Sequence, residues 1–298
     1  MRALVTGSAG FVGRHMIRIL TGDGLTVNGF DLFSGNDVRD YEQVRQVIDR
    51  FEPDLVFHLA AVSWPRESLT DPRRSFDVNV TGAVNILEAV RNVGSHARIM
   101  LAGTSEEYGY EGRAGEFLTE DSACRPASPY GVSKLAAGLL GMVYARRYDM
   151  PVVAMRAFNH SGAGRQACNA ESAFARRIVA VERGQADKVL HGDLSSVRNF
   201  SNVRDVIAAY REAIWQEPGI WNVCGNDDGT VTMRQMMDML TEMATVPVLL
   251  EQDFRLGGPA ERGFPVPVHD KLTKACGWEP RVPLEETLSE VLDYWRSR

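Results

Sequence analysis

Short apolar runs alternate with amphipathic stretches through the first half of the chain. The apolar runs ALVT, TVNGF, DLVFHLAAV, ARIMLAG and PVVAMRAF occupy residues 3–6, 26–30, 54–62, 97–103 and 151–158. Because these runs are continuous rather than alternating, they predict parallel strands that are covered on both faces. Helical patterns separate them at 13–20, 41–51, 75–93 and 130–148. This order predicts an α/β fold with a doubly wound parallel sheet.

The alternation ends after Ala157. Glycine-rich polar loops follow at 159–166 and 225–230, and isolated helical patterns follow at 231–244 and 283–298. A chain of 298 residues exceeds what one core usually fills. We therefore expect a dinucleotide-binding domain at 1–160 and a smaller substrate-binding lobe at 161–298. Residues from about 197 to 224 are expected to return to the first domain.

The stretch VTGSAGFVG joins the first predicted strand to the first predicted helix. Gly7, Gly10 and Gly13 give it the spacing GxxGxxG. Glycine at this turn permits tight geometry and close approach of the backbone to a pyrophosphate, and the helix N-terminus favours the phosphate charge. An ordinary glycine turn is the alternative. The strand before it and the helix after it favour a Rossmann-like dinucleotide site.

Asp31 ends the second predicted strand, 24 positions after Gly7. An acidic residue at about this spacing accepts the adenosine ribose hydroxyls. The carboxylate repels a 2′-phosphate, and no arginine or lysine immediately follows it. The sequence therefore predicts a preference for NAD(H), with NADP(H) as the alternative.

The segment between Asp31 and Tyr41 is only nine residues long. A helical crossover usually takes about a dozen residues. The third strand must therefore be a stub or its crossover a bare loop, and NDVRD at 36–40 is the expected stub. Asp37 and Val38 would then lie beside the adenine. A solvated acidic turn is the other interpretation.

Tyr130 and Lys134 are four residues apart at the start of a predicted helix, and so share one face of it. In isolation, such a pair is more often a surface aromatic and a solvated lysine. After a dinucleotide fold, the phenol can exchange a proton with a sugar oxygen while a nicotinamide exchanges a hydride at the same carbon. Lys134 would favour the tyrosine anion and hold the nicotinamide ribose. Thr104, at the end of the preceding strand, would share the substrate oxygen.

Composition and charge narrow the remaining classes. Hydrophobic residues make up 44% of the chain, which excludes wholesale disorder. A net charge of -6 argues against a nucleic-acid partner. The four cysteines form no CxxC pair and the six histidines no HExxH motif, so neither a disulfide framework nor a metal is expected. With neither a signal peptide nor an apolar run of about 18 residues, we expect a cytoplasmic protein without a membrane span.

Seven motifs then occur in a familiar order. They are GxxGxxG, FHLAA, GTSEEYG, SPYGVSK, RAFNHSGAG, VRNFSNVRD and GWEPRVPLEETL. Over nearly its whole length the chain resembles the extended short-chain dehydrogenase/reductases, in their nucleotide-sugar branch. Within that branch it looks most like the GDP-4-keto-6-deoxy-D-mannose reductases, which form GDP-D-rhamnose. The GDP-mannose 4,6-dehydratases are close relatives. SEEYG, RAFNH and LDYWR carry the resemblance to the reductases.

The resemblance implies roles for particular residues. Thr104, Tyr130 and Lys134 match the catalytic residues, and Glu106 matches the base that the dehydratases carry. The positions matching the cofactor site are Gly7, Gly10, Phe11, Val12, Asp31, Asp37, Val38, Leu59, Ala60, Ala61, Tyr130, Lys134 and His160. The positions matching the substrate site are Ser105, Glu106, Asn159, Arg198 and Glu261. Glu107 is expected to be a solvated turn residue and Tyr108 a packing residue.

The chain departs from the family around residue 258. The family generally has an Arg-Pro pair just before Ser-Glu, whereas this chain reads RLGGPAERG at 255–263. Arg255 or Arg262 is the candidate replacement for the missing phosphate contact. A GDP-linked substrate is therefore expected from the resemblance as a whole rather than from this segment.

Three functions are compatible with these residues. The preferred one is NAD(P)H-dependent reduction of the 4-keto group of a nucleotide-linked 4-keto-6-deoxyhexose. A 4,6-dehydratase or 4-epimerase with tightly bound NAD is the alternative, and Glu106 alone does not separate the two because the reductases also carry a glutamate there. A non-catalytic dinucleotide sensor is disfavoured by the intact Thr104, Tyr130 and Lys134. The resemblance also implies a homodimer packed through the helices around 76–93 and 130–148.

Overall fold

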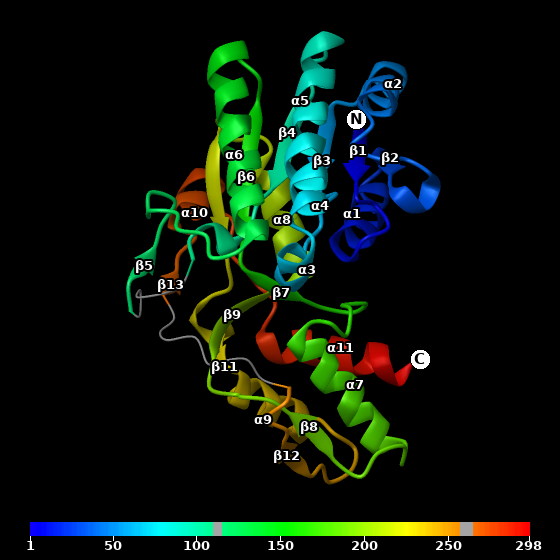
Figure 1. Cartoon of the computed structure of the whole chain (residues 1–298), viewed down its shortest axis with the longest axis vertical. Helices are drawn as coiled ribbons and strands as arrows, with labels where there is room; N and C mark the ends of the chain where they lie inside the picture. The colour runs from blue at the N-terminus through cyan, green and yellow to red at the C-terminus, as the bar shows by residue number, and fades with distance from the viewer. Residues whose placement is uncertain (110–114, 257–264) are drawn as a thin grey trace.

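A six-stranded sheet forms the centre of the upper half of the molecule (Figure 1). The computed structural model describes residues 1–109, 115–256 and 265–298. All neighbouring strands of this sheet are parallel, in the order β10-β6-β4-β3-β1-β2. Their bounds are β1 Arg2–Thr6, β2 Thr26–Phe30, β3 Leu55–His58, β4 Arg98–Ala102, β6 Val152–Ala157 and β10 Gly219–Val223. The predicted α/β fold with a doubly wound parallel sheet is thereby confirmed.

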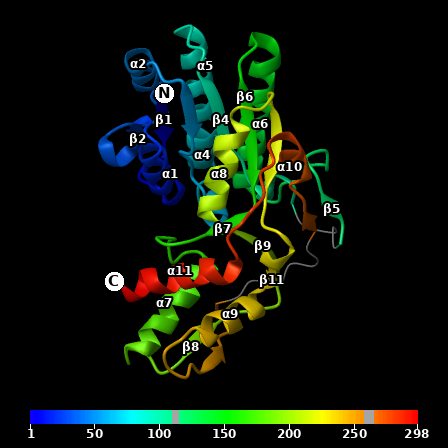
Figure 2. The same ribbon diagram turned by 180° about the vertical axis from the view of Figure 1, so that it is seen from behind.

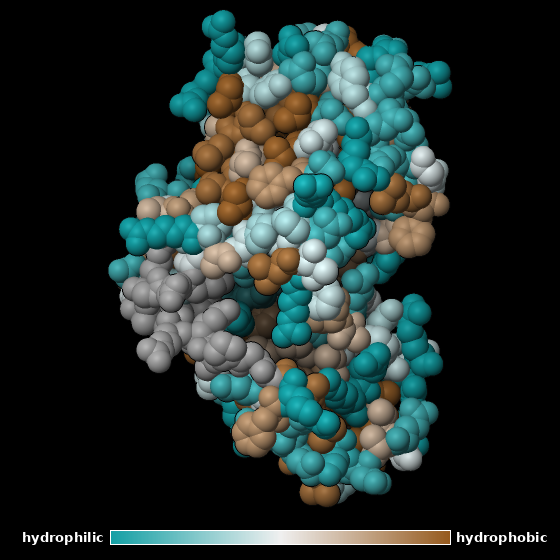
Figure 3. All heavy atoms as spheres, in the orientation of Figure 1, coloured by the Kyte–Doolittle hydropathy of each residue, from teal (hydrophilic) through white to brown (hydrophobic). Residues whose placement is uncertain are grey.

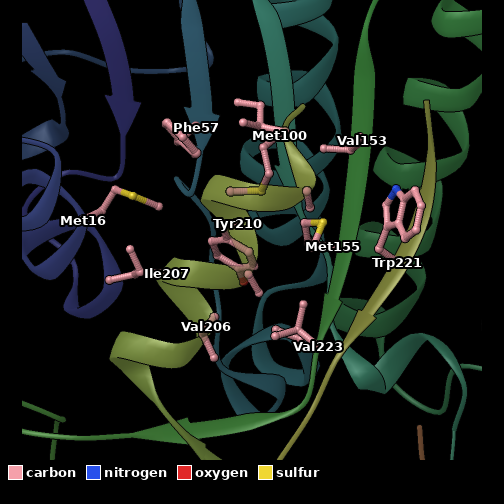
Figure 4. Close-up of a cluster of buried hydrophobic side chains, with 14 of the residues drawn as sticks. Met16, Phe57, Met100, Val153, Met155, Val206, Ile207, Tyr210, Trp221 and Val223 are labelled. Carbon is pink, nitrogen blue, oxygen red and sulfur yellow. The ribbon is translucent and has the colours of Figure 1, made fainter. Parts of the chain in front are cut away.

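Helices cover both faces of the sheet. Three of them, α2 (Tyr41–Phe51), α5 (Gly82–Asn92) and α6 (Pro129–Tyr148), pack on the face seen in Figure 1. On the other face, seen in Figure 2, lie α1 (Phe11–Gly22), α8 (Val203–Ala213) and α10 (Asp270–Cys276). Figure 4 shows Val206, Ile207 and Tyr210 of α8 in one apolar cluster with the sheet residues Phe57 and Met155. Two apolar layers with the sheet between them therefore fix where the carboxyl ends of the strands meet.

The expected strand stub at 36–40 does not exist, and the bare loop is correct. After β2 the chain makes a 3-10 turn over Leu32–Ser34 and reaches α2 without another strand. Side chains within the segment take up its polar groups: Asp37 accepts from Arg39, and Asp40 caps α2 by accepting from Gln43 N at 3.1 Å. Only Val38 is buried, and Asn85 Nδ2 donates to its carbonyl at 2.9 Å. Because side chains of the segment itself, of α2 and of α5 satisfy these groups, the segment needs no strand partner.

The long helix expected at 75–93 is divided by a π-helical segment. Helix α4 (Pro72–Phe76) passes through the π segment Asp77–Thr81 into α5. Asn79 in the π segment is 1% exposed, accepts from Val62 N at 2.8 Å and donates to Ser133 Oγ at 2.9 Å. The wider turn thus lets one side chain bridge the loop after β3 to helix α6. Short π segments of this kind often occur beside functional sites.

Smaller elements form the lower half of the molecule (Figures 1 and 2). A three-stranded sheet has the order β11-β9-β7, and β12 pairs with β8. These strands are β7 Asn159–Ser161, β8 Val189–His191, β9 Val197–Asn202, β11 Thr230–Thr232 and β12 Leu250–Gln252, with helices α7 Ala170–Glu182, α9 Met233–Glu242 and α11 Leu284–Arg296 around them. A third apolar cluster holds these elements together. The predicted domain bounds stay a prediction; β10, at 219–223, pairs with β6 of the upper sheet.

Candidate active site

The glycine loop lies between the carboxyl end of β1 and the start of α1. Gly7 has φ +68, and a Cβ there would stand 2.7 Å from Ala60 N. Gly10 is the N-cap of α1, where no side chain caps the helix and no acidic residue occupies the first turn. The N–H groups of that turn therefore remain available to a negatively charged group, and the helix dipole favours it. These residues fit the diphosphate of a dinucleotide.

The Asp31 carboxylate stands at the end of β2, facing this loop. Its Oδ2 accepts from Ala9 N at 3.0 Å and its Oδ1 accepts from Phe33 N at 3.0 Å. Each carboxylate oxygen can accept a second hydrogen bond, so Asp31 can bind ribose hydroxyls while it holds the loop. Asp37 is paired with Arg39, and this ion pair lowers the pKa of Asp37.

Tyr130 is positioned by the start of helix α6. Ser128 caps the helix by accepting from Gly131 N at 3.1 Å, and Pro129 occupies the first turn. The backbone N–H of Tyr130 donates to Ser68 Oγ at 3.1 Å, while its carbonyl accepts from Ser133 Oγ at 2.7 Å. Asn79 holds Ser133 in turn. Both backbone polar groups of Tyr130 are thus tied to neighbouring segments.

Burial sets the protonation of Tyr130 and Lys134. It raises the pKa of Tyr130 to about 12, against the effect of a hydrogen bond with Thr104. It lowers the pKa of Lys134 to about 8, against the attraction of Glu107. Lys134 is only 5% exposed. At neutral pH the site therefore holds a protonated phenol next to a threonine hydroxyl, with an ammonium group on the same helix face.

The rings of His160 and Phe11 pack against each other at the site. Their rings stack with centroids 6.3 Å apart. Burial lowers the pKa of His160 to about 4, so the imidazole is neutral at physiological pH. Its Nδ1 donates to the Phe158 carbonyl at 2.9 Å, which leaves Nε2 as the acceptor nitrogen.

The expectation that Glu107 is solvated is wrong. Its side chain is 3% exposed and forms an ion pair with Arg156, with Nε and Oε2 2.7 Å apart. Arg156 lies on β6, so a residue 49 positions away in sequence determines this burial. Tyr108 is fully buried, as expected of a packing residue, and its hydroxyl donates to Asn222 Oδ1 at 2.6 Å.

Most of the predicted site residues line one cavity of about 560 Å³. Figure 3 shows it as the hollow between the upper and lower halves of the molecule. The predicted residues that line it are Gly7, Gly10, Phe11, Val12, Asp31, Asp37, Val38, Leu59, Ala60, Ala61, Thr104, Ser105, Glu106, Tyr130, Lys134, Asn159 and His160. Arg198 does not line it; its Nη1 donates to the Val197 carbonyl at 2.7 Å. Glu261 and Arg262 lie outside the described residues, and Arg255 is paired with Asp253.

Sequence reasoning missed Arg165, which also lines the cavity. Its guanidinium carbon lies 5.0 Å from the Phe11 ring centroid, and its charge contributes to lowering the pKa of His160. Its Nη2 donates to Asn169 Oδ1 at 3.0 Å. The only signal in the sequence was its place in the glycine-rich loop after RAFNH. Arg165 brings a positive charge to a cavity whose other lining cations, among the described residues, are Arg74 and Lys134.

The described residues contain neither a metal-binding group of side chains nor a helix that could span a membrane. No group of three or more His, Cys, Asp or Glu side chains that could hold a metal ion occurs within 1–109, 115–256 and 265–298. Over the same part of the chain, no helix has the length and apolar character needed to cross a bilayer.

The chain is similar to known proteins over nearly its whole length. A family described as GDP-mannose 4,6 dehydratase matches residues 4–291. The GDP-6-deoxy-D-mannose reductase of Pseudomonas aeruginosa is 28% identical over 300 residues, covering all of this chain and 98% of that protein. The UDP-glucose 4-epimerase of Mycolicibacterium smegmatis is 27% identical over 328 residues, covering all of this chain and 99% of that protein.

Solved structures agree with the sequence comparison. The structure of RMD from Pseudomonas aeruginosa complexed with NADPH has a TM-score of 0.89 at 28% identity, covering all of this chain and 99% of that one. The Thermus thermophilus UDP-glucose 4-epimerase complex with NAD has a TM-score of 0.86 at 30% identity, with 99% of both chains covered. The resemblance stated from the motifs is confirmed. The chain belongs to the GDP-mannose 4,6-dehydratase family of short-chain dehydrogenase/reductases, enzymes that use a nicotinamide dinucleotide.

Proposed function

We propose that the protein is a nucleotide-sugar reductase that converts the 4-keto group of a GDP-linked 4-keto-6-deoxyhexose into an alcohol, forming GDP-D-rhamnose. The observation that carries the proposal is Tyr130, a protonated phenol beside Thr104 in a cavity that also contains the glycine loop. A bound NAD(P)H supplies the hydride at this site. The full-length similarity to a GDP-6-deoxy-D-mannose reductase supports the GDP-linked substrate.

The chain's own residues then handle the proton and the charge. Thr104 donates a hydrogen bond to the keto oxygen, and Tyr130 transfers its phenolic proton to that oxygen as the hydride reaches the carbon. The Lys134 ammonium stabilises the tyrosinate that this transfer leaves. Tyr130 starts this reaction as the acid, and its raised pKa keeps it in the acid form.

A 4,6-dehydratase or 4-epimerase is the second candidate, and one observation favours it. Glu106 lines the cavity, and its charge contributes to the raised pKa of Tyr130, so a carboxylate lies near the reacting position. Two parallel reactions separate the candidates. The reductase consumes NADH or NADPH when given GDP-4-keto-6-deoxy-mannose. The dehydratase forms a keto sugar from GDP-mannose without added reductant, and that result would overturn the reductase proposal.

The proposed cofactor is NAD(H), with NADP(H) as the alternative. Asp31 lines the cavity where the adenosine ribose is expected, and Arg39 is already paired with Asp37. We predict that Asp31→Asn raises the ratio of kcat/KM for NADPH to that for NADH by about tenfold, because relieving about 1.4 kcal/mol of charge repulsion has this effect. Steady-state kinetics with both cofactors measures this ratio. General damage to the loop lowers both kcat/KM values and therefore cancels in the ratio. An unchanged ratio would contradict the role of Asp31.

We also propose a homodimer packed through the helices around 76–93 and 130–148, which are α5 with the end of α4 and the π segment before it, and α6. Leu139 and Val143, one turn apart on α6, are 49% and 47% exposed, and Phe76 on α4 is 39% exposed. Figure 3 shows apolar side chains gathered in the upper half of the face, where Figure 1 places α6. A contiguous apolar patch of this kind is typical of an interaction surface, and a second copy of the chain offers a matching one.

The patch gives a direct prediction. Leu139→Glu places a charge in the interface and is expected to convert the dimer into a monomer, measured by light scattering after size-exclusion chromatography. Leu249→Glu is the matched control, because Leu249 is more exposed than Leu139 yet lies outside α4 and α6. A wild-type monomer, or a Leu139→Glu dimer, would contradict the proposed interface.

A further inference from the structure

A buried ion pair between Glu107 and Arg156 contacts the backbone of Thr104, one of the proposed catalytic residues. Glu107 and Arg156 are 2% and 3% exposed, and Nε of the arginine donates to Oε2 of the glutamate at 2.7 Å. Nη1 of the arginine also donates to Tyr108 Oη at 3.1 Å and to the Glu120 carbonyl at 3.2 Å. Two fully desolvated charges are expensive, and apolar residues of similar size often stabilise a fold equally well. The pair therefore calls for an explanation other than stability.

The second oxygen of Glu107 reaches the site. Oε1 accepts from the backbone N–H of Thr104 at 2.9 Å, while the Thr104 hydroxyl accepts from Glu106 N at 3.3 Å. Gly103 makes this approach possible, since a Cβ at that position would stand 2.5 Å from Oε1. The carboxylate thus links β6, through Arg156, to the backbone of the residue whose side chain hydrogen-bonds with Tyr130.

Burial raises the pKa of Glu107, whereas Arg156 and the Thr104 N–H lower it, and because both its oxygens accept hydrogen bonds the group is a carboxylate. Its charge also acts on the other two site residues. It opposes the lowering of the Lys134 pKa and contributes to raising the Tyr130 pKa. Other charged or titratable groups also interact with these three residues: Arg156 with Glu107, His58 with Lys134, and Glu106, Arg165 and Tyr210 with Tyr130. Of the acidic groups near the site, Glu107 is the one that contacts both the backbone of Thr104 and Arg156 of the central strand β6.

We propose that Glu107, fixed by Arg156, is a positioning residue that holds Thr104 against Tyr130 and places a carboxylate charge where it acts on Lys134. The proposal rests on the proposed reductase function for its kinetic consequence only. It differs from the role of Glu106, which lines the cavity where substrate is expected. Glu107 does not line this cavity, and it acts through its hydrogen bond with the backbone of Thr104.

Glu107→Gln tests the proposal by removing the charge while keeping the shape. We expect kcat to fall about tenfold with each KM within about twofold of wild type, because the loss is in orientation and charge rather than in binding. We also expect the activity to decline at a lower pH than in wild type, because Lys134 loses its proton earlier. Tyr108→Phe is the matched control: it removes another hydrogen bond of Arg156 and leaves Thr104 untouched. It should change the thermal midpoint without moving the pH profile.

A titration of Lys134 separates this inference from the proposed function, because it needs no substrate. Carbon-13 NMR of labelled lysine, assigned with Lys134→Met, follows the Lys134 pKa in the intact protein. Glu107→Gln should lower that pKa and Tyr108→Phe should leave it unchanged. If Glu107→Gln does not fold, the double variant Glu107→Gln/Arg156→Met removes both charges of the ion pair and carries the same expectation. An unchanged Lys134 pKa in a folded variant would overturn the inference, whatever the turnover assays give.

Discussion

Tyr130→Phe is expected to lower kcat of the keto-sugar reduction by about 100- to 10,000-fold, the range that a positioned general acid contributes. Phenylalanine keeps the ring between its buried neighbours and removes only the hydroxyl that Thr104 contacts. Cofactor binding should remain close to that of wild type, because the glycine loop and Asp31 are unaltered. Stopped-flow loss of nicotinamide absorbance measures the rate, and fluorescence titration measures the cofactor affinity.

The matched control is Tyr144→Phe on the same helix. The Tyr144 hydroxyl donates to Glu88 Oε1 at 2.5 Å, and its side chain does not line the cavity. This variant removes one hydroxyl from α6 and should retain kcat within about threefold, since the lost hydrogen bond affects stability alone. Turnover of Tyr130→Phe at the rate of the control would refute the assignment of Tyr130 as the acid.

Gly7→Ala has the second largest expected effect, on cofactor affinity. An alanine at φ +68 is strained, and its Cβ would stand 2.7 Å from Ala60 N, so the loop must move away from β3. We expect the dissociation constant of the dinucleotide to rise about 100-fold, since losing about 2.7 kcal/mol of charge-assisted hydrogen bonding has this consequence. Calorimetry with NADH and NADPH measures the change.

Gly24→Ala is the control that separates the strain of a left-handed backbone from the steric clash with Ala60 at Gly7. Gly24 has φ +81, and nothing lies within 4 Å of its Cβ position. This variant should lose about 1–2 kcal/mol of stability from left-handed strain alone, with unchanged cofactor affinity. Equal affinity losses in the two variants would show that strain, and not the shape of the glycine loop, determines cofactor binding.

The sheet and the glycine loop could be predicted because each depends on neighbouring residues. Continuous apolar runs identify strands covered on both faces, and β1 with α1 places the three glycines without any distant contact. Five of the six strands of the sheet follow from this local information, and the sixth, β10, comes from the segment at about 197–224 that was expected to return to the first domain.

The errors concern residues whose environment depends on distant parts of the chain. Glu107 looks like an exposed turn residue until Arg156 arrives from β6 and buries it. Arg165 lies in a polar loop without a motif of its own, and its place beside Phe11 depends on how that loop folds over α1. At 36–40 the bare loop was one of two predictions, and side chains of α2 and α5 decide for it: Gln43 accepts from Asp37 N and Asn85 donates to the Val38 carbonyl.

The central claim is that a hydride passes from free reduced cofactor to C4 of a keto sugar nucleotide. NADH or NADPH deuterated at the transferring position of the nicotinamide, mixed with GDP-4-keto-6-deoxy-mannose and this protein, tests it directly. The account predicts a GDP-deoxyhexose that carries the deuterium at C4 and one oxidised cofactor released for each product molecule, measured by mass spectrometry and NMR. A product without deuterium, or conversion of GDP-mannose to its keto sugar with no net cofactor consumed, would contradict it.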